Sequence, residues 1–231
     1  MAGRFDGMAL RRAAVLCAGG EEALKMRLPT VRSAAALRRM ADDRYLSDMA
    51  RRVFRAGLRH SMVDDRWPAF EEVFLGFEPR RVVAMDDEAL EGLMGESRII
   101  RHWGKIRSVR DNAAAMLRVA QEAGSFGAWL AAWPITDTTG LWRVLRKEFS
   151  QLGGHSGPRF LRMVGRDTFL LTEDVARGLA NWWGLDKPPK GARGELVAQA
   201  AFNEMRERWE GGKPPPLAHL SMMLAVAADA S

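Results

Sequence analysis

The sequence has a single cysteine, Cys17, among its 231 residues. One cysteine excludes an internal disulfide, and a cysteine zinc cage would need ligands that the sequence lacks. The four histidines (His60, His102, His155 and His219) are far apart and do not have the spacing of metal ligands. We therefore expect no metal and no cofactor.

Long apolar runs are also missing. No stretch approaches the roughly 18 consecutive apolar residues of a membrane helix. The N-terminal segment is a poor secretory signal, because Arg4, Asp6, Arg11 and Arg12 interrupt its apolar part. A Walker A loop, a GxGxxG turn and an HExxH pair are absent as well. We expect a cytoplasmic protein that does not interact with a membrane.

What is present is an ordinary globular composition, 47% hydrophobic and 28% charged. The 35 Lys and Arg residues exceed the 29 Asp and Glu residues, which gives a net charge of +6. This excess favours a polyanionic partner and says nothing about the fold.

Helical periodicity dominates the chain. Leu46, Met49, Val53 and Phe54, for example, follow the spacing of one helix face, and strand-like alternation is weak throughout. The sequence predicts an all-α fold of about ten helices. Residues 1–40, rich in Ala and Arg, are expected to form peripheral helices, followed by one domain over 41–231.

A glycine-rich turn separates two helical patterns, 141–149 and 159–164. Such a turn leaves backbone N–H groups pointing outward, next to the positive N-terminus of the following helix, and this arrangement binds phosphate. Arg159 adds positive charge. A tight interhelical turn without a ligand is the alternative. The residues of the turn are Gly153, Gly154, His155, Ser156 and Gly157.

Two further segments have the composition of nucleic-acid contacts. Basic residues, among them Arg101 and Lys105, alternate with apolar ones over residues 96–112, which suits a helix facing a polyphosphate. Gly57 and Leu58 follow a predicted helix, where an apolar side chain can enter a base stack. The alternatives are a solvated basic face for the first segment and a glycine helix cap for the second.

The order of these segments resembles the DNA-3-methyladenine glycosylase I (TAG) family of the helix-hairpin-helix glycosylase superfamily. The resemblance extends from about Asp43 to Val175. The stretches that carry it are AGL at 56–58, F-x-x-F-x-P at 74–79, and IIRHWGKI at 99–106 with Asn112-Ala113.

The resemblance implies a bilobed helix-hairpin-helix fold over residues 41–231 that binds double-stranded DNA as a monomer at the nucleoid. The implied reaction is cleavage of the N-glycosidic bond of an alkylated base after it is flipped out of the duplex. The turn at 153–157, with Arg159, Arg101 and Lys105, would hold DNA phosphates. Gly57 and Leu58 would probe the duplex.

Some positions depart from the family pattern. Arg52 stands where the family has a pocket glutamate, and His60 stands where it has a tryptophan. Arg52, His60 and Trp103 would line an altered base pocket. Thr172 takes the place of a catalytic Asp found in many superfamily members, and the adjacent Glu173 and Asp174 are the candidate catalytic carboxylates. The family's zinc ligands have no counterparts. A DNA-binding protein without catalysis is therefore the alternative function.

Overall fold

The computed structural model describes residues 5–210 and 212–230. Residues 1–4, 211 and 231, which belong to the expected regions 1–40 and 41–231, lie outside the described residues. All regular secondary structure in the described part is helical, which confirms the all-α prediction. It comprises fifteen α-helices and three short 3-10 helices, more than the ten expected. Several of the additional helices have only five to seven residues, too few to show a period in the sequence.

The contacts within the chain divide it into two compact units that interleave along the sequence. The first unit comprises residues 1–31, 134–140 and 167–231, and the second comprises 32–133 and 141–166. The expected boundary after residue 40 stays a prediction about domain organisation. No helix in the described part of the chain is both long and apolar enough to cross a membrane.

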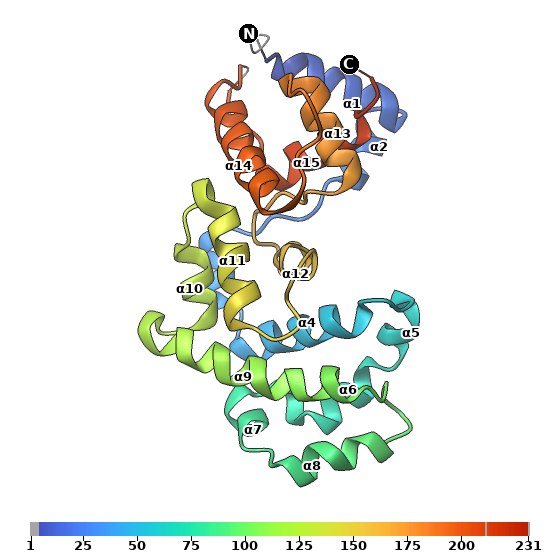
Figure 1. Ribbon diagram of the computed structural model, residues 1–231, viewed down its shortest axis with the longest axis vertical. Helices are drawn as coiled ribbons and strands as arrows, with labels where there is room; N and C mark the ends of the chain where they lie inside the picture. The colour runs from blue at the N-terminus through green and yellow to red at the C-terminus, as the bar shows by residue number, and fades with distance from the viewer. Residues whose placement is uncertain (1–4, 211, 231) are drawn as a thin grey trace. The chain divides into compact units, whose positions relative to one another are not determined.

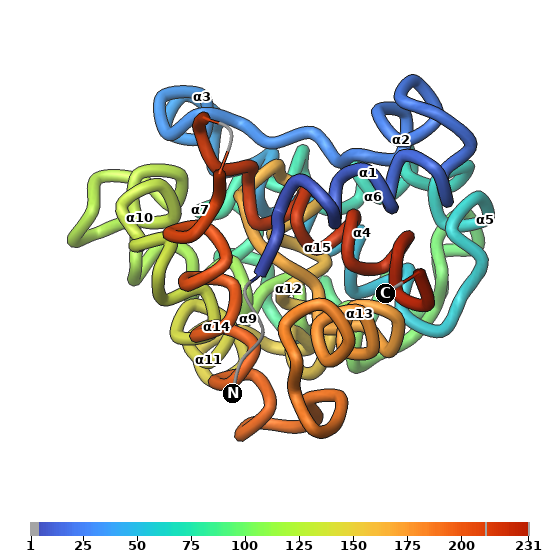
Figure 2. Tube along the Cα trace, turned by 90° about the horizontal axis from the view of Figure 1, so that it is seen from above, coloured from blue at the N-terminus to red at the C-terminus, as the bar shows by residue number. Residues whose placement is uncertain are grey.

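The first unit packs around α15 (Leu217–Val226), an apolar helix that contacts both α13 and α1. The helices α13 and α15 run close to one another (Figure 2). A Cβ added at Gly178 of α13 would be 2.2 Å from the Leu224 carbonyl oxygen of α15, so only glycine allows this approach. Phe169 and Phe202 stack with their ring centroids 4.3 Å apart. The other helices of this unit are α1 (Gly7–Ala18), α2 (Glu21–Arg27), η3 (Ile135–Asp137), α13 (Glu173–Trp183) and α14 (Gly191–Glu207).

The second unit is organised around α4 (Asp42–Arg55), which packs between α9 and α12 (Figure 1). Acidic residues in its first turn and basic residues in its last turn complement the helix dipole. The apolar face predicted from Leu46, Met49 and Val53 is buried. The other helices that lie mainly in this unit are α3 (Ala34–Arg39), α5 (His60–Asp65), α6 (Trp67–Val73), η1 (Leu75–Phe77), α7 (Pro79–Val83), α8 (Asp87–Gly92), η2 (Leu93–Gly95), α9 (Trp103–Ala123), α10 (Phe126–Ala132), α11 (Thr138–Glu148) and α12 (Ser156–Met163).

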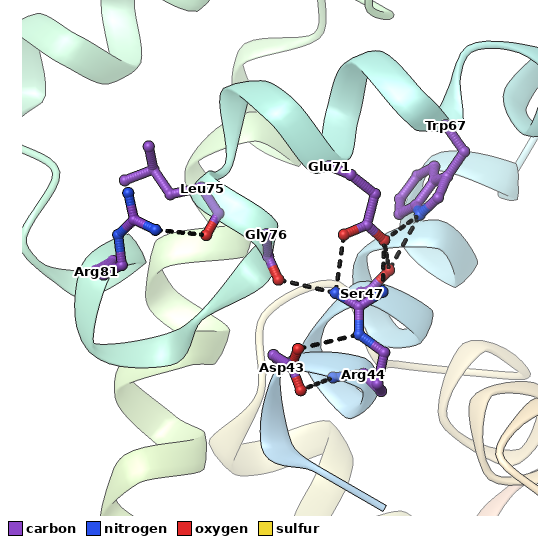
Figure 3. A network of polar contacts seen from close by, with 8 residues as sticks. All are labelled: Asp43, Arg44, Ser47, Trp67, Glu71, Leu75, Gly76 and Arg81. Carbon is purple, nitrogen blue, oxygen red and sulfur yellow. Dashed lines mark hydrogen bonds and ion pairs between the residues drawn. The ribbon is translucent and has the colours of Figure 1, made fainter.

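A polar network around Glu71 fixes α4 against α6 (Figure 3). The Glu71 carboxylate accepts hydrogen bonds from the Arg44 guanidinium at 2.9 and 3.0 Å, from the Ser47 hydroxyl at 2.6 Å and from the Trp67 indole at 3.2 Å. Burial raises the pKa of Glu71, but the bonds from Arg44, Ser47 and Trp67 outweigh it and hold this pKa below its ordinary value. Arg44 also donates to the carbonyl of Gly76, whose φ of +71° is unfavourable for other residues. The network therefore supports the tight turn after α6.

Candidate functional site

The glycine-rich turn is an exposed hairpin that leads directly into α12. Gly153, Gly154 and His155 are exposed, and Gly154 has a φ of +55°. The hairpin is closed by the N–H groups of Ser156 and Gly157, which donate to the carbonyls of Gly153 and Leu152. In the described part of the chain the N–H groups of Gly154 and His155 have no acceptor. The predicted arrangement is present: a glycine turn with free N–H groups at a helix N-terminus, which suits a phosphate.

Asn112 holds the start of the hairpin from α9. Its Nδ2 donates to the Ser150 carbonyl at 3.1 Å, and its Oδ1 accepts the Ser150 N–H at 2.6 Å. The next residue, Gln151, lies close to the N-terminus of α9, since a Cβ on Gly104 would be 3.9 Å from its Nε2. Asn112 is 1% exposed. Its positioning role was missed from the sequence, where the signal was an amide side chain on the apolar face of a helix.

The predicted duplex probe follows the end of α4. Gly57 has a φ of +76° and meets no atom within 4 Å of an added Cβ, so its conformation rather than crowding requires glycine. Leu58 is partly exposed. The Lys105 ammonium donates to the carbonyls of Phe54 at 3.3 Å and Ala56 at 2.7 Å, which are among the last carbonyls of α4. Lys105 therefore ties the probe segment to α9 and uses two of its donors to do so.

Arg52 is a buried cation that has no counterion among the described residues. It is 7% exposed, and its Nε is buried with no hydrogen-bond acceptor in the described part of the chain. Burial lowers the pKa of Arg52, and the charges of Arg159 and Arg55 lower it further. Burial likewise lowers the pKa of Lys105, with a further contribution from Arg52. We call Arg52, Lys105 and Arg159 the Arg52 cluster.

Several predicted site residues lie near the ends of helices that pack together in the second unit. Packing of α12 against α4 places Arg159 near Arg52. Trp103 begins α9 and is 37% exposed, with the exposed Arg101 two residues before it. His60 is exposed at the start of α5, and no described contact joins it to the Arg52 cluster.

Glu173 and Asp174 have a different location. Both are exposed in the first turn of α13, which belongs to the first unit, and the side chain of Thr172 caps that turn. Asp174 forms an ion pair with Arg177 at 2.7 Å. All the other predicted site residues belong to the second unit.

Asp48 is a carboxylate that sequence reasoning missed. It lies one turn before Arg52 on α4, which is the signal that would have identified it. Burial raises the pKa of Asp48, and the charges of Arg51, Arg32 and two further arginines oppose this increase. Asp48 makes no ion pair with Arg52 among the described residues.

Comparisons with known proteins agree with this architecture. Residues 38–147, just under half of the chain, match the family model for methyladenine glycosylase. DNA-3-methyladenine glycosylase 1 of Escherichia coli (strain K12) is 37% identical over 71 residues, which are 31% of this chain and 38% of that protein. The match thus spans well under two thirds of this relative's length, and both the hairpin and α12 follow the end of the family match.

Two solved structures share the fold. A crystal structure of 3-methyladenine DNA glycosylase I (TAG) has a TM-score of 0.51 and 23% identity, covering 62% of this chain and 86% of that one. A crystal structure of a mutant of 3-methyladenine DNA glycosylase I from Staphylococcus aureus has a TM-score of 0.51 and 20% identity, covering 65% of this chain and 90% of that one. At these identities the similarity shows the fold alone.

Proposed function

Since the chain is related to the methyladenine glycosylase (TAG) family through residues 38–147, we propose that it is a monofunctional DNA glycosylase. It hydrolyses the N-glycosidic bond of a modified base that is flipped out of double-stranded DNA. The protein acts as a monomer on nucleoid DNA in the cytoplasm, without a cofactor or membrane.

The observation that carries this proposal is the convergence of three element ends in the second unit. Asn112 holds the hairpin against α9, Lys105 holds the end of α4 against α9, and α12 packs against α4. A duplex held by phosphate contacts at the hairpin would lie near the segment that contains Leu58 and near the Arg52 cluster.

Each group has a defined task in the proposed reaction. The free N–H groups of Gly154 and His155 bind one DNA phosphate. The positive charges of Arg159, Arg101 and Lys105 attract the neighbouring phosphates of the backbone. Leu58, aided by the turn at Gly57, fills the gap that the flipped nucleotide leaves. The phosphate contacts fix the register and orientation of the duplex on the protein. They do not read the base sequence.

The remaining site residues act on the flipped nucleotide. Arg52, His60 and Trp103 contact the base, and Trp103 offers an aromatic face for stacking. The role predicted for Glu173 or Asp174, which belong to the first unit, is that of an auxiliary carboxylate that would stabilise positive charge on the sugar as the bond breaks. Negative charge near the sugar would stabilise its oxocarbenium-like transition state. Water is the nucleophile.

The test is release of free base from a panel of duplexes, each with one central lesion, measured by mass spectrometry. The panel includes both cationic N-alkylated purines and neutral deaminated or oxidised bases. We expect release from at least one class and salt-sensitive binding to all duplexes. Binding without release from any lesion would contradict the enzyme and support the alternative, a DNA-binding protein without catalysis.

A further inference from the structure

The starting point is the unbalanced charge of Arg52. Arg52 is 7% exposed, its Nε is buried without an acceptor, and no carboxylate in the described chain forms an ion pair with it to offset the cost of desolvating its charge. Arginine keeps its proton in proteins, so the site cannot relieve this cost by neutralising the side chain. The missing counterpart is a ligand that accepts hydrogen bonds and carries or develops negative charge.

The surroundings strengthen this requirement. Arg159, exposed in the first turn of α12, and Lys105, on α9, add positive charge on two sides of Arg52. Arg55 forms an ion pair with Asp64, so that carboxylate is already occupied. The carboxylate of Asp48, one turn away, interacts with Arg51, Arg32, Arg44 and Arg55 rather than forming an ion pair with Arg52.

Glycosidic chemistry distinguishes two classes of base by charge. When the bond from C1′ to the base nitrogen breaks, the electron pair leaves with the base. A cationic N-alkylated purine leaves as a neutral molecule, whereas a neutral base leaves as an anion. A fixed guanidinium opposes binding of the cation, and it stabilises the negative charge that develops on a departing neutral base.

We propose that Arg52 donates hydrogen bonds to the flipped base and makes this site selective for neutral bases with carbonyl oxygens, such as hypoxanthine or uracil. The inference rests on the proposed glycosylase function. The C1′–N bond breaks, the base leaves as an anion paired with Arg52, and water adds to C1′. The proton of that water neutralises the base anion, so the products are free base and an abasic sugar. Arg52 remains protonated throughout.

The experiment compares three variants with the wild-type protein on duplexes with one hypoxanthine, one uracil or one 7-methylguanine. Arg52→Gln removes the charge, and Arg52→Lys keeps a charge without the two-pronged donor geometry. Arg80→Gln is the control, because Arg80 is an exposed residue of α7 and its loss changes the net charge equally. Thermal unfolding of each variant checks that it folds.

We expect the wild-type protein to release a neutral base and no 7-methylguanine. R52Q should lower kcat for the neutral base by about 100-fold or more, the usual effect of removing one donor to a developing anion. R52K should retain part of the rate, and R80Q all of it. Free hypoxanthine should bind the wild-type protein more tightly than R52Q in a calorimetric titration, a readout of base contact that does not depend on turnover.

Several outcomes would overturn the inference. Release of 7-methylguanine alone would refute the selectivity while leaving the glycosylase function intact. If R52Q released the neutral base as fast as the wild-type protein, the role of Arg52 would likewise be refuted and the glycosylase function would stand. R52Q could instead weaken binding to every duplex equally and reduce the slope of log affinity against log salt concentration by about 1. Arg52 would then be a phosphate contact and not a base contact. Release of no base from these duplexes or from any duplex of the wider lesion panel would refute the proposed function itself.

Discussion

Asn112 bonds both backbone groups of Ser150, although the two residues are 38 positions apart. One side-chain amide on α9 thereby holds the backbone that leads into the hairpin. The buried amide satisfies the backbone just before the residues whose free N–H groups face outward.

Replacing this amide should therefore affect both stability and binding. Asn112→Ala leaves two backbone groups of Ser150 without partners, and we expect it to lower the free energy of unfolding by about 1–3 kcal/mol. Duplex affinity should fall with it, because the hairpin is no longer held. Urea unfolding and fluorescence anisotropy with a labelled duplex measure the two effects.

Asn203→Ala provides the comparison for that variant. Asn203 also donates from an amide to a loop carbonyl, that of Thr136, but it lies in the first unit. This variant should leave duplex affinity unchanged. If N112A were destabilised and still bound duplex normally, the hairpin would not be the phosphate site.

The hairpin itself can be tested at Gly154. Gly154→Asp places a carboxylate beside the free N–H groups, and we expect duplex affinity to fall at least tenfold through repulsion of the phosphate. Gly124→Asp is a matched control, because Gly124 also has a positive φ, +87°, and open space at its Cβ. Both variants therefore add one negative charge at a residue with a positive φ, and urea unfolding shows whether either is destabilised. Similar losses of affinity in both would exclude a specific role for the hairpin.

The probing role of Leu58 predicts a separation of binding from catalysis. Leu58→Ala should reduce base release about tenfold, since the flipped state loses the side chain that fills its gap. Affinity for an undamaged duplex should change little. Met94→Ala, which truncates an exposed apolar residue elsewhere in the second unit, is the control. Loss of affinity without loss of the release rate would argue against a probe at this position.

Glu71 predicts a dependence of stability on pH. Its pKa is lowered in the folded protein, so its contribution to stability is complete above its ordinary pKa of 4.5 and is lost as the pH falls through the folded value. Glu71→Gln should lower the free energy of unfolding by about 1 kcal/mol at neutral pH, because the network is only partly buried. Urea unfolding between pH 3 and pH 7 would follow this difference.

The difference between wild type and E71Q should shrink toward the acidic end of that range. Glu72→Gln, at the neighbouring exposed position, should change stability little, because its ion pair with Arg98 is solvated. A pH-independent effect of E71Q would mean that packing rather than charge is responsible.

Local sequence determined the helical class and several element boundaries of this protein. Apolar spacing identified α4, and the glycine turn before α12 followed from residue type. These features depend on interactions within a few residues, so the sequence displays them directly.

Only the tertiary structure decided how the side chains of the site are used. The sequence suggested that Lys105 favours phosphate, and the structure adds that its ammonium donates to two carbonyls at the end of α4. The sequence likewise did not show that Glu173 and Asp174 belong to the first unit, whereas the other candidate site residues belong to the second. Arg52 was noticed as a substitution, but its lack of a counterion depends on which helices cover it. Contacts between residues distant in sequence arise from packing, and no local pattern encodes their partners.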